Sequence, residues 1–148
     1  MWRVIELAVE DTHDVRRRVL RDHRPDDSVD LPEDHLPGTV HLGVVDDSGV
    51  GSAVVAVATV FPDATDFRPG ASAARLRGMA VDHHLQGQGA GSVLLAAVVE
   101  WARRQGHGVL WANGRDSALG FYERHGWAPV GEGFTTLDLP HHVVLLDL

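Results

Sequence analysis

The spacing of hydrophobic residues changes along the chain and predicts both strands and helices. A period of about two residues predicts strands at 2–8, 39–45, 50–61 and 75–81. After residue 91 the apolar positions recur every three or four residues up to the double Arg at 103–104, which predicts a long helix.

Loops and a short helix separate these elements. Thr12 is expected to cap a helix that ends near Leu20. The segment Asp22–Gly38 contains three Pro and many acidic residues, so we expect a solvated surface loop. A second loop is expected at Asp63–Ser72, and residues 46–49 predict the turn of a hairpin.

The composition limits the class of protein. A length of 148 residues with 44% hydrophobic residues suits one globular domain, taken as residues 1–148. The absence of Cys excludes disulfides, thiolate zinc sites and a Cys nucleophile. The N-terminus lacks a basic signal-like region, and no apolar stretch has the length of a membrane span. We therefore expect a soluble cytoplasmic protein without a membrane partner.

The charge of the chain argues against nucleic acid as a partner. The net charge is −8, and all 13 basic residues are Arg. Residues 1–74 carry a net charge of −7 and residues 75–148 only −1, so the second half tolerates an anionic ligand better. The His residues at 83–84 and 141–142 are adjacent pairs that would point to opposite faces of a strand, and we predict no metal site.

A glycine-rich loop, Gln86–Gly91, precedes the long helix. Small residues there let backbone N–H groups approach a pyrophosphate, and the helix dipole favours its charge. The alternative is a tight strand-to-helix turn without a ligand. A Walker A loop is excluded because Ser92 follows Gly91 and the chain has no Lys, and a dinucleotide fingerprint would belong earlier in the chain.

With this loop, the chain resembles the GNAT superfamily of N-acetyltransferases. Gln86, Gly89 and Gly91 match the phosphate loop of that family. The next elements of the family are then expected in order: a strand at 109–113 and a short helical run from Ala118 to Trp127, which looks like the family's second signature. The resemblance covers residues 75–130. It implies an α/β (α+β) fold with a mixed, mostly antiparallel sheet flanked by helices, whose two central parallel strands splay apart.

The resemblance also implies an activity and a cofactor. The expected reaction moves an acetyl group from acetyl-coenzyme A (acetyl-CoA) to a small-molecule or peptide amine, by direct attack through a tetrahedral intermediate. The implied cofactor-binding residues are Met79, Ala80, Val81, Gln86, Gly87, Gln88, Gly89, Ala90, Gly91, Ser92 and Asn113. For Asn113 the alternative is a residue that only caps the following turn.

Tyr122, the only Tyr, stands where the family commonly has its general acid. Its alternative role is packing under the cofactor. The general base is less determined: His41 is ranked first, while His141, His142 and a water relay stay open. Arg75 and Arg77 stand where the family often has its base, but Arg stays protonated and cannot serve.

Strand alternation places Arg75, Arg77 and Met79 on one face. If that face borders the acceptor cleft, the two Arg are candidate substrate-binding residues for an anionic group beside the amine. The alternative is that they pair with Asp82 or Glu6 and only hold the sheet. The sequence leaves open a silent coenzyme A sensor, another phosphate-ligand enzyme and a homodimer, and it does not identify the acceptor.

Overall fold

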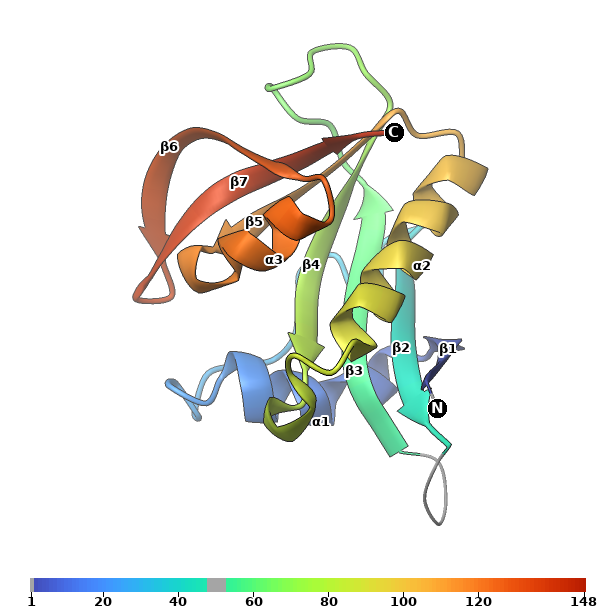
Figure 1. The fold of residues 1–148 in the computed structure, drawn as a ribbon, viewed down its shortest axis with the longest axis vertical. Helices are drawn as coiled ribbons and strands as arrows, with labels where there is room; N and C mark the ends of the chain where they lie inside the picture. The colour runs from blue at the N-terminus through green and yellow to red at the C-terminus, as the bar shows by residue number, and fades with distance from the viewer. Residues whose placement is uncertain (1, 48–52) are drawn as a thin grey trace.

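The computed structural model describes residues 2–47 and 53–148, and its strands form one seven-stranded sheet (Figure 1). The strands are β1 Trp2–Leu7, β2 Val40–Asp46, β3 Ala53–Pro62, β4 Ala73–Val81, β5 Val109–Arg115, β6 Ala128–Thr136 and β7 Leu139–Asp147. Their order is β1-β2-β3-β4-β5-β7-β6, and every neighbouring pair is antiparallel except β4 and β5. The mixed, mostly antiparallel sheet is confirmed. Ser48 and Gly49 of the predicted turn lie outside the described residues.

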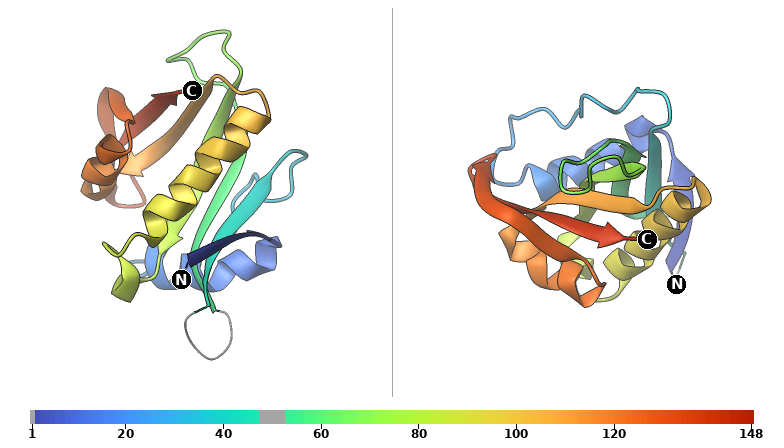
Figure 2. Two further views of the ribbon diagram at one scale, coloured as in Figure 1. Left: turned by 45° about the vertical axis from the view of Figure 1, so that its right-hand side comes forward. Right: turned by 90° about the horizontal axis from the view of Figure 1, so that it is seen from above.

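Helices cover both faces of the sheet (Figures 1 and 2). The helix α2, Ala90–Arg104, crosses one face of β1–β4 and buries Leu94, Leu95 and Val98 completely, as its spacing predicts. On the other face lies α1, His13–Val15, between a 3-10 turn at Val9–Thr12 and a π-type turn at Arg16–Leu20. A 3-10 turn at His83–Leu85 precedes α2, and another at Asp116–Ala118 precedes α3, Leu119–Arg124. No helix among the described residues is long and apolar enough to cross a membrane.

The parallel strands β4 and β5 pair over only part of their length. Ala73–Leu76 pair with Val109–Ala112, and beyond these residues the strands separate (Figure 1). β4 continues to Val81 and β5 continues to Arg115, but these later residues of the two strands do not pair with one another. The splay expected of the central strands is therefore present, and it opens the sheet next to the start of α2.

A β-bulge in β4 changes which side chains share a face. Gly78 has a φ of +60°, and the β3–β4 register shifts so that Gly78 and Met79 together oppose Ala58. Arg75 and Arg77 still share a face, as alternation predicts. Met79 does not share it, because the extra residue turns its side chain to the core beneath α2. The prediction that these three side chains share a face is therefore wrong for Met79.

The segment Thr12–Leu20 is helical, but Thr12 does not cap it. The chain is already helical from Val9, so Thr12 has helical dihedral angles, with φ −88° and ψ −20°. Its hydroxyl donates to the carbonyl oxygen of Val9 at 2.6 Å. A capping residue needs an extended backbone to accept from the first turn, so the capping prediction is wrong.

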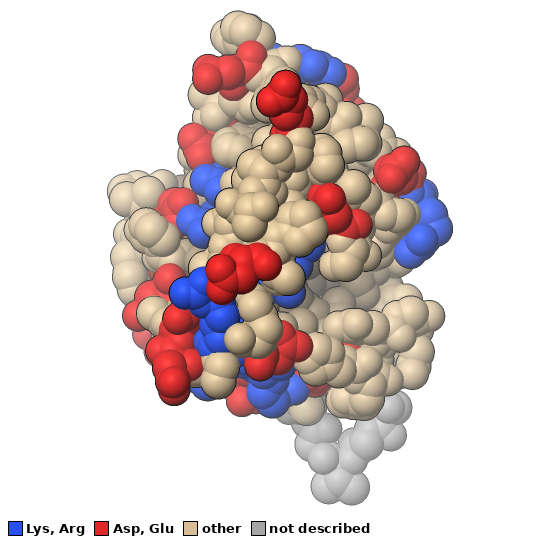
Figure 3. Space-filling model, turned by 90° about the vertical axis from the view of Figure 1, so that its left-hand side faces the viewer, with Lys and Arg blue, Asp and Glu red and all other residues tan. Residues whose placement is uncertain are grey.

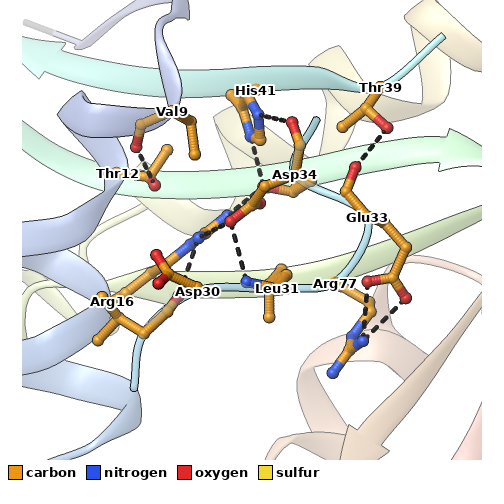
Figure 4. A network of polar contacts seen from close by, with 12 residues as sticks. Val9, Thr12, Arg16, Asp30, Leu31, Glu33, Asp34, Thr39, His41 and Arg77 are labelled. Atoms are coloured by element: carbon orange, nitrogen blue, oxygen red, sulfur yellow. Dashed lines mark hydrogen bonds and ion pairs between the residues drawn. The ribbon is translucent and has the colours of Figure 1, made fainter. Parts of the chain in front are cut away.

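The segment Asp22–Gly38 is a loop, as predicted, but its centre is buried rather than solvated. The side chains of Val29, Leu31 and Asp34 are buried. Figure 4 shows the loop bound to the sheet and to the helical segment by a polar network, in which Asp34 accepts from both terminal nitrogens of Arg16 at 2.9 Å. The loop is therefore fixed at its middle.

Candidate active site

The splay of β4 and β5 gives rise to two adjoining cavities. The first, of about 620 Å³, lies between the end of β4, the glycine loop and α3. The second, of about 310 Å³, lies between β4, β5 and the turn from β6 to β7. Leu20, Met79, Arg115, Ala118 and Tyr122 line both, so the cavities meet at these residues. Figure 3 shows a recess on the side of β6 and β7, with basic side chains at its edge and mixed basic and acidic side chains beside it.

The glycine loop leaves open space at the start of α2. Gly87 and Gly89 line the first cavity and have φ values of +81° and +103°. A Cβ at Gly87 would meet nothing within 4 Å, and one at Gly89 only Trp2 Nε1 at 3.9 Å. The N–H groups of the first turn of α2 have no carbonyl partner within the helix. This arrangement suits a phosphate that approaches the backbone.

Other residues of the loop have partners inside the protein. A Cβ at Gly91 would lie 3.3 Å from Val81 Cγ2, so Gly91 permits close packing of α2 on β4. Gln86 lines the first cavity and donates from Nε2 to the carbonyl oxygen of Val81 at 3.0 Å. Gln88 and Ala90 are not among the residues that line either cavity; Gln88 donates to the His84 carbonyl, and Ala90 is fully buried.

Ser92 lines the first cavity and connects α2 to α3. Its hydroxyl oxygen lies 2.9 Å from Nε2 of His125. Nδ1 of His125 lies 2.8 Å from the carbonyl oxygen of Phe121, and because a carbonyl only accepts, Nδ1 donates. The Ser92 side chain is therefore held in the first turn of α2 by His125, the residue that follows α3.

The predicted strand residues divide between the two cavities. Met79, Ala80 and Val81 line the first cavity, while Asn113 is exposed and lines the second. β5 does not end at Asn113 but continues to Arg115. Asn113 therefore lies in the second cavity rather than beside the glycine loop.

Tyr122 stands where the two cavities meet. Its ring is buried and packs against Phe121 and Trp127, and Gly114 makes room for it, because a Cβ there would lie 3.2 Å from the ring. Burial raises the pKa of the phenol to about 12. Among the described residues the hydroxyl has no hydrogen-bond partner. The side chain is therefore a protonated donor with no internal acceptor.

His41 lies away from both cavities, buried on β2. Its Nε2 donates to the carbonyl oxygen of Asp34 at 3.2 Å, so Nδ1 carries the lone pair and accepts from the hydroxyl of Thr59 at 2.8 Å. Both ring nitrogens are thus used inside the protein. We do not retain His41 as the general base.

His141, one of the open alternatives, lines the second cavity. Its Nδ1 lies 2.8 Å from the carbonyl oxygen of Leu139, which requires a proton on Nδ1 and leaves the lone pair of the neutral ring on Nε2. The β5–β7 register places His141 directly opposite Arg115. His142 instead contacts Asp116 at 2.7 Å and does not line either cavity.

Arg75 and Arg77 line the second cavity, where both face the loop residue Glu33. Arg77 Nη1 donates to the two carboxylate oxygens of Glu33 at 2.9 and 3.0 Å, and Arg75 Nη1 lies 3.8 Å from Glu33. The guanidinium of Arg75 also stacks 4.8 Å above the ring of Trp111. The alternative that the two Arg pair with acidic residues is therefore confirmed, although neither of the two examples named for it is the partner.

The expected partners lie elsewhere. Asp82 pairs with Arg18, and Glu6 lies in β1, three strands away from β4 in the sheet order. Sequence reasoning also missed Arg21 and Arg115, which line the second cavity. The signal for Arg115 was its place two residues after the end of the predicted strand at 109–113.

Comparisons with known proteins agree with this geometry. Residues 3–127 match the acetyltransferase (GNAT) family. The chain is 34% identical over 145 residues to YitI, an uncharacterized N-acetyltransferase of Bacillus subtilis (strain 168), covering 98% of this chain and 95% of YitI. An acyl-CoA N-acyltransferase from Pseudomonas aeruginosa has a similar structure, with a TM-score of 0.75, 17% identity and coverage of 98% and 97% of the two chains.

The ribosomal-protein-S18-alanine N-acetyltransferase of Escherichia coli is also similar in structure, with a TM-score of 0.71, 18% identity and coverage of 99% and 94%. At such identities the structural likeness shows the fold alone. The family match and the relative from B. subtilis extend over most of the chain. On this evidence the chain belongs to the GNAT family and is an acetyltransferase.

Proposed function

We propose that the protein, acting as one domain over residues 1–148, transfers the acetyl group of acetyl-CoA to the amine of a small molecule or peptide. The observation that carries the proposal is the position of Tyr122, a protonated phenol at the junction of two cavities. The larger cavity has a phosphate-suited glycine loop and the smaller one has a histidine with an available lone pair. Two cavities that share an acid suit a reaction between two substrates.

The first cavity would hold the cofactor. Backbone N–H groups at Gly87, Gly89 and the first turn of α2 would bind its pyrophosphate. The unpaired edge of β4 at Met79 and Val81 would bind the amides of its pantetheine arm. Arg124 lines the same cavity and, within the described residues, forms no ion pair, so it can meet a further phosphate charge.

Tyr122 at the junction and His141 in the second cavity would move the protons. Bound acetyl-CoA supplies a thioester carbonyl, which a neutral amine can attack. Tyr122 holds a proton that it can donate to the departing sulfur, because its raised pKa keeps the phenol protonated at neutral pH. His141 Nε2 can accept the proton of the amine, since Nδ1 is already committed to Leu139.

A binding and turnover experiment tests this function. Thermal unfolding is measured with acetyl-CoA, NADH and ATP, and coenzyme A release is measured with amino acids, polyamines, aminoglycosides and peptides with free N-termini. We expect acetyl-CoA alone to raise the melting temperature, and at least one amine to release coenzyme A. Stabilisation without turnover on any amine would instead indicate a silent sensor, and no stabilisation would remove the assignment of the first cavity.

A further inference from the structure

The second cavity has an excess of positive charge. Four Arg from three parts of the chain line it: Arg21, Arg75, Arg77 and Arg115. Arg21 follows the π-type turn, Arg75 and Arg77 belong to β4, and Arg115 ends β5. A cavity of about 310 Å³ is at the small end of ligand sites, so it suits a small molecule or one end of a larger one.

Two of the four Arg already have a carboxylate. Glu33 contacts both Arg77 and Arg75, and Asp63 lies 3.8 Å from Arg75. Glu33 is adjacent to the buried Asp34. Because Asp34 anchors the loop, the Glu33 carboxylate is held beside β4 (Figure 4). These contacts show that Arg75 and Arg77 hold the loop against the sheet.

The other two Arg have only carbonyl partners. Arg115 Nη2 donates to the carbonyl oxygen of Leu20 at 2.9 Å, and Arg21 Nη1 donates to the same oxygen at 3.3 Å. Arg21 Nε donates to the carbonyl oxygen of Ser28 at 3.1 Å. Within the described residues neither guanidinium has a carboxylate within 4 Å. Since both guanidinium groups donate to the carbonyl oxygen of Leu20, their two positive charges lie close together.

This arrangement is electrostatically unfavourable without an anion. Partial burial lowers the pKa of Arg21, and the charges of Arg115, Arg77 and Arg16 lower it further, against an opposing effect of Asp27. A carboxylate between the two guanidinium groups would relieve the repulsion and accept charge-assisted hydrogen bonds from both.

The position of Arg115 relates such an anion to the proposed chemistry. Arg115 lines both cavities and lies opposite His141 in the register of β5 and β7. An anion held by Arg115 would therefore lie on the same face as the proposed base. An acceptor whose amine and carboxylate are a few bonds apart can reach both groups at once.

We propose that Arg21 and Arg115 form a carboxylate-binding site, and that the acceptor is an amino acid or a similarly small amine that carries a carboxylate. This proposal rests on the proposed function, because it names the acceptor of the same site. It replaces Arg75 and Arg77 as the anion-binding pair, since those two are occupied by Glu33.

The experiment compares each amino acid with its carboxamide, which keeps the amine and removes the negative charge. Coenzyme A release is measured for the wild type, Arg21→Gln, Arg115→Gln and Arg115→Lys. Arg103→Gln serves as control, because Arg103 is exposed in the last turn of α2 and lines neither cavity. Ethanolamine and phosphoethanolamine are assayed in parallel to separate carboxylate from phosphate.

We expect the wild type to prefer the best amino acid over its carboxamide, and each Gln variant to reduce that preference by about 10- to 100-fold. Arg115→Lys should recover part of the preference, and Arg103→Gln should keep all of it. The Michaelis constant for acetyl-CoA should stay unchanged in Arg21→Gln and Arg103→Gln, because neither residue lines the first cavity. A preference for an uncharged amine, a polyamine or phosphoethanolamine would overturn the carboxylate assignment. A preference that both Gln variants retain would overturn the choice of residues.

Binding without turnover separates this proposal from the function on which it rests. Amino acids and their carboxamides are titrated into the protein saturated with coenzyme A, and heats of binding are recorded. If amino acids bind selectively and Arg115→Gln removes this selectivity, the site is supported even when no acceptor is acetylated. If neither the amino acid nor the carboxamide of any pair binds, the proposal of a carboxylate site fails. The assignment of the first cavity to the cofactor is tested separately, by the melting shift with acetyl-CoA.

Discussion

Asp34 and Arg16 face each other inside the protein through two parallel hydrogen bonds of 2.9 Å, with side chains only 2% and 1% exposed. The carboxylate comes from the loop and the guanidinium from the helical segment (Figure 4). Thr59 in β3 accepts a third hydrogen bond from Arg16 at 2.8 Å. One ion pair thus joins loop, helical segment and sheet.

Removing one partner of this pair should destabilise the fold strongly. We expect Asp34→Ala to lower the free energy of unfolding by about 3–5 kcal/mol, because it leaves a buried guanidinium without its counter-charge. Asp30→Ala is the matched control, since the Asp30 side chain is 76% exposed in the same loop, and it should change stability by less than about 0.5 kcal/mol. Urea unfolding of the three proteins measures both values, and equal losses would contradict the prediction.

The same pair should make stability depend on acid pH. Burial tends to raise the pKa of Asp34, but hydrogen bonds from Arg16 and the Leu31 N–H outweigh it and lower the pKa below its ordinary value of 3.8. A lowered native pKa means that this contribution is complete above the ordinary value and is lost as the pH falls through the native one. Urea unfolding between about pH 2 and pH 7 should therefore show an acid loss that is smaller in Asp34→Asn.

The phenol of Tyr122 can be tested without disturbing its packing. Tyr122→Phe keeps the ring between Phe121 and Trp127 and removes only the hydroxyl. We expect turnover to fall by about 10²-fold, the usual effect of one general acid, while the affinity for acetyl-CoA stays the same. Steady-state kinetics and a melting shift with acetyl-CoA measure the two effects. Turnover within a few-fold of wild type would assign the ring a packing role only.

The two histidines that competed for the role of base can be compared directly. His141→Gln should lower turnover by about 10²-fold, because it removes the proposed base from the second cavity. His41→Gln should instead cost about 1–3 kcal/mol of stability, since it disturbs buried hydrogen bonds to Thr59 and Asp34, and it should keep its activity. The reverse pattern would restore His41 as the base.

A substitution in the glycine loop tests the proposed phosphate binding, and a glycine of similar conformation after the C-terminal end of α2 provides its control. Gly87 and Gly106 have similar φ values, +81° and +83°, and a Cβ at either would meet nothing within 4 Å. Both Glu substitutions should therefore cause similar backbone strain. Gly87→Glu should also abolish the melting shift with acetyl-CoA, because it puts a carboxylate where phosphate is expected, while Gly106→Glu should keep it. Loss of the shift in both would mean that strain alone explains it.

Local signals in the sequence predicted the parts of the site that are formed by local structure. The glycine loop and α2 follow directly from residue spacing and from small residues before a helix, and α2 begins within one residue of the loop that predicts it. The surroundings of the histidines, in contrast, depend on contacts between segments that are far apart in the sequence. The hydrogen-bond partners of His41 are Thr59 and the carbonyl of Asp34, which only the folded loop brings to β2.

The bulge in β4 was a missed signal rather than an absent one. A Gly inside a predicted strand often marks a bulge, and Gly78 stands between Arg77 and Met79. Treating the strand as regular placed Met79 on the wrong face. No comparable signal identified Glu33 as the partner of Arg77, because that contact depends on the path of a 17-residue loop with three Pro.

The short paired stretch between β4 and β5 has a consequence for folding. Ala73–Leu76 and Val109–Ala112 are the only paired stretches joining β1–β4 to β5–β7 among the described residues. Within each of these two groups the strands are antiparallel and pair largely with segments that are near in sequence. The β4–β5 pairing can form only after α2 has crossed the sheet. We expect two cooperative units in native-state hydrogen exchange. The amides of the paired stretch between β4 and β5 should exchange through an opening of lower free energy than the amides of β2 and β3.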